Sequence, residues 1–153
     1  MNYRPEKLNI PRSEKPLKST LNAASLPSYD WRSYNRVTPV KDQKSCGSCW
    51  AFASTAQYES LLMMGTNGTT YDLAEQYALE CDKSSSGCNG GNPYSALGLI
   101  KSTGIPLESS YPYQYQSDSY YKSQSKPICS DTSRIKLTQS VISLKYYSNL
   151  SEE

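Results

Sequence analysis

The sequence Gln43-Lys44-Ser45-Cys46-Gly47-Ser48-Cys49-Trp50 contains two of the five cysteines and leads directly into a helical pattern. From Cys49 to Met64 there is no proline or glycine, and Gly65 follows as a candidate C-cap. Apolar residues recur there at three- and four-residue spacings, which predicts that they form the buried face of a helix. These apolar residues are Trp50, Phe52, Ala53, Ala56, Leu61 and Met64.

Cys49 is therefore expected at the N-terminus of a helix. The unpaired N–H groups and the helix dipole favour negative charge there, so a thiolate is stabilised and the cysteine is a candidate nucleophile. The Cys46-Gly47-Ser48-Cys49 spacing is equally typical of a redox-active or structural cysteine pair. From this stretch alone, both interpretations remain open.

The length, net charge and hydrophobic pattern of the sequence exclude several classes of protein. With 153 residues, a single domain is expected. The net charge is +2 and no basic patch with interleaved aromatic residues is present, so a nucleic-acid partner is not predicted. No apolar run reaches the length that spans a membrane.

Five cysteines predict two disulfides and one free thiol in an oxidising compartment, although counting alone does not give the pairing. The N-terminus has no apolar stretch typical of a secretory signal, so none is predicted in this chain. The sequence also contains no histidine. A Ser/His or Cys/His hydrolase needs an imidazole as its general base, and these residues do not supply one.

Further elements follow from local signals. Residues 1–25 are polar and basic, and we expect a disordered arm or a propeptide or linker remnant. Ordered structure is expected to begin, in extended form, at 26–32. Asp72 with Glu75 forms a candidate capping box for a helix at about 73–80. Asn92 as N-cap and Pro93 at the first helical position predict another helix, which ends near Gly104.

Beyond a long irregular loop at 111–126, the pattern at 134–147 is typical of a strand. A second candidate capping box, Asn149 with Glu152, stands just before the last residue. A strand without an obvious partner, followed by the start of a helix, favours a truncated domain. A frayed polar tail is the alternative.

Four sequence blocks together resemble the papain family (C1) of cysteine peptidases. They are Leu26-Pro27 with Asp30-Trp31-Arg32, Val37 to Phe52, Leu73 to Asp82, and Gly87-Cys88-Asn89-Gly90-Gly91 with Pro93. Tyr111-Pro112-Tyr113 is a fifth and weaker match. The signature around the cysteine is a recognised mark of this family. The resemblance implies an α+β fold, with a mainly helical left-hand domain at 26–133 and the start of a truncated, β-rich right-hand domain at 134–153.

The resemblance implies roles for individual residues. Cys49 corresponds to the nucleophile that forms a thioester with the substrate. Gln43 corresponds to the side-chain donor of the oxyanion hole, beside the backbone N–H of Cys49. The substrate-binding positions are Gly47, Gly90, Gly91 and Pro93. The implied disulfides are Cys46–Cys88 and Cys81–Cys129.

The catalytic histidine and asparagine of the family have no counterpart here, so we expect this chain alone to be inactive. The implied partners are peptide or protein substrates and possible propeptide or cystatin-like inhibitors, with the chain itself monomeric. The implied location is a lysosome, a vacuole or the extracellular space. Asn67 and Asn149 lie in glycosylation sequons that would matter on a secretory route.

Alternative functions remain at this stage. The chain could be a non-catalytic module that binds peptides or inhibitors, or a thiol–disulfide oxidoreductase that uses Cys46 and Cys49. Cys81 and Cys88 as zinc ligands are disfavoured, because ligand pairs usually stand two to four residues apart with histidine nearby. No metal or other cofactor is predicted.

Overall fold

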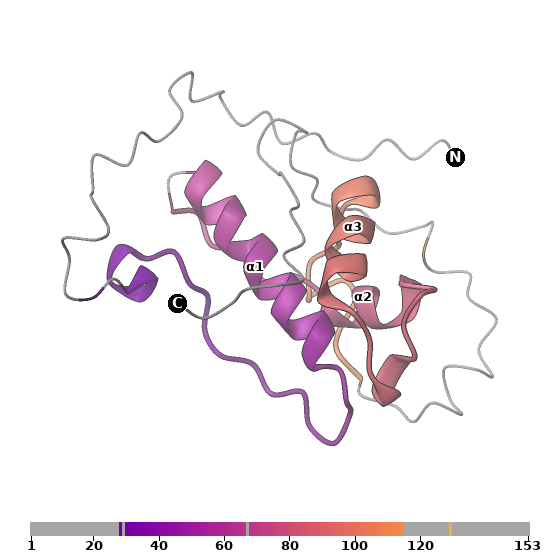
Figure 1. Ribbon diagram of the computed structural model, residues 1–153. Coiled ribbons are helices and arrows are strands. Elements are labelled where there is room, and N and C mark those ends of the chain that lie inside the picture. The colour runs from indigo at the N-terminus through magenta and orange to yellow at the C-terminus, as the bar shows by residue number, and fades with distance from the viewer. Residues whose placement is uncertain (1–27, 29, 67, 115–128, 130–153) are drawn as a thin grey trace, which may run out of the picture.

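The computed structural model describes residues 28, 30–66, 68–114 and 129, and everything below is confined to them. Three α-helices lie in this part: α1 (Cys49–Gly65), α2 (Glu75–Cys81) and α3 (Pro93–Thr103). Two 3-10 helices, η2 (Trp31–Tyr34) and η3 (Gly87–Asn89), complete the elements. In Figure 1, α2 and α3 lie on one side of α1, and η2 lies apart from the three helices.

The described part is mainly helical, as expected for the helical portion of the α+β fold. Its β structure is one antiparallel bridge between Leu73 and Leu107. Several expectations concern residues outside the described part. They are the arm at 1–25, the strand at 134–147, the right-hand portion at 134–153, and the sequons at Asn67 and Asn149.

The helices enclose two groups of buried side chains. The larger group joins the middle of α1 to α2 and α3, and its members are Tyr58, Leu62, Leu73, Ala74, Tyr77, Cys81, Ile100, Ile105 and Tyr111. The second group surrounds the start of α1, and its members are Cys46, Trp50, Ala51, Ala78, Leu79 and Ala96. Burying each large apolar side chain contributes about 1.5–3 kcal/mol, so the second group fixes the helix end that carries Cys49.

Helix α1 begins at Cys49 as predicted and runs one residue further than predicted, because Gly65 is its last residue and Thr66 is the C-cap. The predicted buried face is wrong apart from Trp50. Ala53 and Ala56 are exposed, and Phe52 is only partly buried. The buried face is instead formed by Trp50, Ala51, Ser54, Thr55, Tyr58, Glu59, Leu62 and Met63. It mixes apolar and polar residues, so apolar spacing alone selects the wrong side of the helix.

The predicted capping box of α2 is also wrong. The helix begins at Glu75, two residues later than expected, and its N-cap Ala74 makes no side-chain cap. Asp72 and Glu75 instead both bind the ammonium group of Lys41, at 2.7 and 2.9 Å. Two carboxylates three residues apart fit a capping box, but here both make charge-assisted hydrogen bonds to a lysine from a distant part of the chain.

The α3 prediction is confirmed. Asn92 is the N-cap, its side chain accepts a hydrogen bond from the N–H of Tyr94 at 2.9 Å, and Pro93 is the first helical residue. Gly104 ends the helix with φ of 81°. At the other end of the described chain, the extended structure expected at 26–32 is wrong for Trp31 and Arg32, which lie in η2, while residues 26, 27 and 29 are outside the described part. The side chain of Asp30 caps η2 by accepting a hydrogen bond from the N–H of Arg32.

Two disulfides link these elements: Cys46–Cys88 and Cys81–Cys129, as the resemblance implied. The first joins the segment before α1 to η3, and the second anchors residue 129 to the end of α2. In the described part of the chain, no helix has the length and apolar character needed to cross a membrane.

Candidate active site

The candidate nucleophile lies where the sequence predicted it. Cys49 is the first residue of α1, its side chain is exposed, and its thiol is free. The N–H groups of Ala51 and Phe52 both donate to the carbonyl of Ser48 as the helix begins. The N–H of a first helical residue has no acceptor within the helix, so Cys49 offers both a thiol and a backbone donor at one helix end.

Residues 43–48 form what we call the nucleophile loop. The chain turns at Lys44, which has a left-handed backbone with φ of 54°. Asp42 accepts a hydrogen bond from the Lys44 N–H at 2.8 Å and supports this turn. The turn brings the partly buried Gln43 back toward the loop, where its Nε2 donates to the carbonyl of Cys46 at 2.8 Å.

Gln43 therefore has a fixed side chain. An amide NH₂ group carries two N–H donors, and the bond to Cys46 uses one of them. Holding the amide through one donor leaves the second available to a developing oxyanion.

The nucleophile loop is held against the second glycine-containing segment. The Gly47 N–H donates to the carbonyl of Cys88 at 2.9 Å, beside the Cys46–Cys88 disulfide. A Cβ at Gly47 would lie only 2.3 Å from that carbonyl oxygen. Glycine at 47 is therefore required for the two backbones to approach this closely.

Glycine is favoured at positions 90 and 91 for different structural reasons. Gly90 has φ of 116°, which favours glycine, and open space lies where its Cβ would be. A Cβ at Gly91 would lie 2.5 Å from the ring of Trp50, whose Nε1 donates to the carbonyl of Gly87 at 3.2 Å. Gly91 thus has a packing role in this structure, beside the substrate-binding role that the resemblance implied.

Pro93 is exposed at the first turn of α3. The structure thus brings the nucleophile loop, the start of α1 and the 87–91 segment into contact through the bonds described above. It shows no such contact between Pro93 and Cys49. Cys46 is bonded to Cys88 rather than to Cys49, which argues against a Cys46–Cys49 redox pair.

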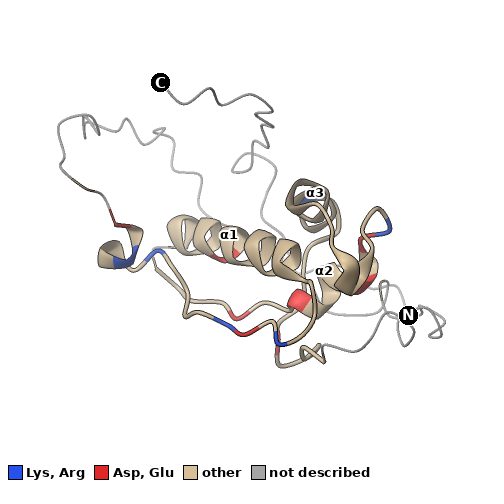
Figure 2. Cartoon of the chain, turned by 60° about the horizontal axis from the view of Figure 1, so that its bottom comes forward, with Lys and Arg blue, Asp and Glu red and all other residues tan. Residues whose placement is uncertain are grey.

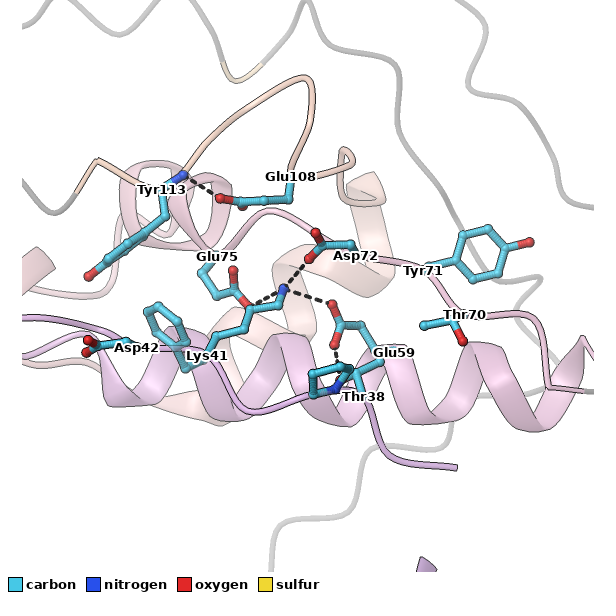
Figure 3. Close-up of a pocket in the computed structure, with 12 residues that line it drawn as sticks. Thr38, Lys41, Asp42, Glu59, Thr70, Tyr71, Asp72, Glu75, Glu108 and Tyr113 are labelled. Carbon is cyan, nitrogen blue, oxygen red and sulfur yellow. Dashed lines mark hydrogen bonds and ion pairs between the residues drawn. The ribbon is translucent and has the colours of Figure 1, made fainter. Parts of the chain in front are cut away.

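A pocket of about 450 Å³ lies beside this site. Neither Cys49 nor Gln43 lines it; its wall includes Lys41, Phe52, Asp72, Glu108 and Tyr113. Figure 3 shows the Lys41 ammonium directed at three carboxylates from different parts of the chain. Its partners are Glu59 at 3.1 Å, Asp72 at 2.7 Å, Glu75 at 2.9 Å and the carbonyl of Leu73 at 3.0 Å.

Burial and charge act together in this cluster. Burial lowers the pKa of Lys41, but hydrogen bonds to Asp72 and Glu75 more than offset it, so the pKa lies above its usual value. Burial raises the pKa of Glu75 to about 7 despite the hydrogen bond with Lys41. Because the effect of burial on Glu75 outweighs the attraction of the Lys41 ammonium, a proton on Glu75 is favourable in mildly acidic solution.

Sequence reasoning did not single out this cluster. One signal was available: Glu59 is the only charged residue in α1. Figure 2 shows α1 almost entirely tan, whereas the segments beside it carry stretches coloured for charged residues. A lone carboxylate on an otherwise uncharged helix indicates a buried partner, because unpaired burial is costly.

The described residues contain no group of three or more His, Cys, Asp and Glu side chains placed to hold a metal ion. Cys81 and Cys88 belong to separate disulfides, so the structure does not support them as a zinc-binding pair.

Comparison with known proteins gives consistent results. The model of the family "Papain family cysteine protease" matches residues 26–153. Papain from Carica papaya is 47% identical over 91 residues, which cover 59% of this chain and 26% of papain. A viral cathepsin from Heliothis zea nuclear polyhedrosis virus is 47% identical over 87 residues, or 56% of this chain and 23% of the relative.

A solved structure shows the same relationship. The bromelain protease from Ananas comosus, in complex with the E64 inhibitor, has a TM-score of 0.53 and 41% identity, covering 58% of this chain and 41% of that chain. The present chain spans about a quarter of the length of the first curated relatives that it matches.

Proposed function

Because the chain belongs to the papain family of cysteine proteases, we propose that it carries the nucleophile side of a peptidase site, with Cys49 as the nucleophile. One observation supports this most strongly. Cys49 is a free and exposed thiol at the first residue of α1, whereas the other four cysteines are in disulfides. Disulfide formation thus leaves a single thiol for chemistry.

In the proposed reaction, the sulfur of Cys49 attacks a peptide carbonyl carbon and a C–S bond forms. The carbonyl π electrons move to oxygen, and this oxyanion is held by Gln43 Nε2 and the N–H of Cys49. The tetrahedral intermediate collapses to a thioester as the C–N bond breaks, and the departing amine takes a proton. Water then hydrolyses the thioester.

This mechanism needs a proton donor for the departing amine, and the sequence supplies no histidine for that role. The 153 residues contain no histidine, so no imidazole of this sequence can accept the thiol proton or protonate the amine. Removing a catalytic base from such a site costs several orders of magnitude in rate. We therefore propose that these residues capture a peptide electrophile but do not turn over peptides efficiently by themselves.

We further propose that the partners are peptides or proteins in extended form, with Gly47, Gly90, Gly91 and Pro93 beside them, and that cystatin-like inhibitors bind the same surface. The chain acts as a monomer and uses no metal in this proposal. Two disulfides in the described structure fit an oxidising compartment such as a lysosome, a vacuole or the extracellular space.

The test uses a peptidyl epoxide of the E64 type and mass spectrometry of the 153-residue chain. We expect one adduct, on Cys49, that forms faster than the adduct of a small free thiol at the same pH, and none on Cys49→Ser. A fluorogenic peptide should show turnover far below that of papain. A rate no faster than a small free thiol would contradict the nucleophile proposal, and papain-like turnover would contradict the inactivity proposal.

The absence of histidine also favours a second candidate, a non-catalytic module that binds extended peptides. Such a module would not need the thiol. Peptide affinity measured by calorimetry would then be equal in the native chain and in Cys49→Ser, and the epoxide would show no rate advantage over a small thiol.

A further inference from the structure

The hydroxyl of Tyr113 makes two hydrogen bonds that neither the packing of the helices nor the proposed chemistry requires. It belongs to the Tyr111-Pro112-Tyr113 block, far along the chain from the nucleophile loop. Its hydroxyl donates to the carbonyl of Gln43 at 2.9 Å, across 70 residues of sequence. The same hydroxyl lies 2.7 Å from the Oγ of Ser48, across 65 residues.

The direction of these hydrogen bonds follows from the number of protons. A carbonyl oxygen can only accept, so the single proton of the Tyr113 hydroxyl goes to Gln43. Ser48 must then donate its own hydroxyl proton to the oxygen of Tyr113. The resulting chain runs from Ser48 through Tyr113 to Gln43 and joins the two ends of the nucleophile loop.

Ser48 bonds to Tyr113 in place of the capping hydrogen bond that is usual at its position. It is the N-cap of α1, where serine usually accepts a bond from a first-turn N–H. Here its side chain makes no cap hydrogen bond, although it is fully buried. The hydroxyl that would cap the Cys49 helix is committed to Tyr113 instead.

Tyr113 is itself held from two sides. Its N–H donates to Glu108 at 2.7 Å, and its ring packs edge-to-face on Phe52 of α1, with centroids 4.9 Å apart. Figure 3 shows the backbone of Tyr113 beside Glu108 and its hydroxyl directed away from that carboxylate. A side chain fixed at both ends can hold the loop that contacts it.

We propose that Tyr113 is a positioning residue that fixes the nucleophile loop, and with it the relative placement of Gln43 and Cys49. The significance for catalysis rests on the proposed function, because it assumes that Gln43 and Cys49 act on one substrate carbonyl. The positioning of the loop does not depend on that assumption. The two parts can therefore be tested separately.

The first test measures the loop alone. In Tyr113→Phe the ring stays on Phe52 but the hydroxyl bonds to Gln43 and Ser48 are lost. Amide hydrogen exchange of Gly47 and Ser48, followed by NMR, should become about 5- to 10-fold faster, as expected for the loss of one or two net hydrogen bonds. Unchanged exchange at both amides would overturn the proposal.

Tyr77→Phe is the matched control. Tyr77 is buried, and its hydroxyl donates to Thr103 at 3.1 Å, which lies at the end of α3 rather than in the loop. This variant loses a comparable hydrogen bond, so it controls for general loss of stability. Equal acceleration of loop exchange in both variants would also overturn the proposal.

The second test measures the consequence for capture of a carbonyl. A dipeptidyl aldehyde forms a hemithioacetal with Cys49 and develops charge on oxygen, whereas the matching alcohol only binds. We expect Tyr113→Phe to weaken aldehyde binding by about 5- to 10-fold and leave alcohol binding unchanged. An aldehyde-to-alcohol affinity ratio equal to that of the native chain would overturn the catalytic part of the proposal.

The outcomes separate this inference from the proposed function. If the native chain binds aldehyde and alcohol equally, the proposed nucleophile fails, and the exchange experiment still decides whether Tyr113 positions the loop. If the native chain prefers the aldehyde and Tyr113→Phe retains that preference, the proposed function stands and the positioning role fails.

Discussion

The partly buried Lys41 forms an ion pair with the buried Glu59, with 3.1 Å between Nζ and Oε1, that joins the segment before the nucleophile loop to the middle of α1. The Glu59 carboxylate also accepts from Thr38 at 2.5 Å and from the N–H of Leu73 at 2.8 Å. Three donors on one buried carboxylate satisfy a charge that would otherwise be costly inside the protein. This relationship fixes where the chain runs just before it reaches Gln43.

The first prediction concerns pH and Glu75. Its pKa is raised by burial to about 7 in the folded chain, against 4.5 for an ordinary glutamate. The folded state therefore binds this proton more tightly, so the stabilising effect is complete below about pH 4.5 and is lost as pH rises through 7. The free energy of unfolding should fall by up to about 3 kcal/mol across that window, measured by urea denaturation.

Glu75→Gln provides the control for this prediction. The amide retains a hydrogen-bond acceptor for Lys41 but cannot titrate, so the decline between pH 4.5 and 7 should become much shallower. Burial also raises the pKa of Glu108, which leaves a smaller slope of the same sign. An identical slope in the native chain and the variant would assign the pH dependence to other groups.

The second prediction is that Lys41→Met destabilises the chain by about 3–5 kcal/mol at pH 7, the usual cost of leaving a buried charge without its partner. Glu59 and Glu75 would then lie buried without their cation, with side chains only 1% and 3% exposed. The loss should be smaller at pH 5, where Glu75 is protonated. Urea denaturation at both pH values measures the difference.

Lys44→Met is the matched control for that experiment. Lys44 pairs with Asp42 at 2.8 Å, but both side chains are more than half exposed. Such a surface pair contributes little, so the change should be within about 1 kcal/mol at either pH. Similar losses in the two lysine variants would show that the buried cluster has no special role.

Local signals in the sequence were sufficient for α1 and α3. A stretch without proline or glycine marked α1, and the Asn92-Pro93 pair marked the start of α3, because caps and breakers act through the nearest few residues. The buried face of α1 could not be predicted in this way. It depends on Lys41 and Thr38 meeting Glu59, which are contacts between distant residues.

The candidate site was likewise predictable only where it depends on residues close together in the sequence. Cys49 was a candidate nucleophile from its place at a helix start, and the resemblance added Gln43, since both belong to a short continuous motif. Tyr113 was noticed only as part of a weak sequence match. Its contacts with Gln43 and Ser48 cross 65 to 70 residues, and no local pattern encodes contacts at that separation.

The third prediction compares the two disulfides. Replacing Cys46 and Cys88 together by alanine should cost about 4 kcal/mol in the chain-entropy model, since the bridge spans 42 residues. Replacing Cys81 and Cys129, with a separation of 48, should cost about the same. Urea denaturation gives both values.

The two variants should nevertheless differ in one local measurement. Only loss of the Cys46–Cys88 bridge releases the segment whose carbonyl accepts from the Gly47 N–H. Hydrogen exchange at Gly47 should therefore accelerate in that variant more than in the other, beyond the shared loss of stability. Equal acceleration would show that the bridge does not hold the nucleophile loop in place.

The last prediction uses two glycines with opposite surroundings. In Gly91→Ala, the new Cβ would lie 2.5 Å from ring carbons of Trp50 and 2.8 Å from the Cβ of Ser85. Trp50 is only 2% exposed and cannot move aside easily, so we expect a loss of about 1–3 kcal/mol from overpacking. In Gly98→Ala, inside α3, the new Cβ meets nothing within 4 Å, and alanine should stabilise the helix by about 0.5–1 kcal/mol. Urea denaturation at pH 7 should therefore move the two midpoints in opposite directions, and a stable Gly91→Ala would show that Trp50 does not pack against this backbone in solution.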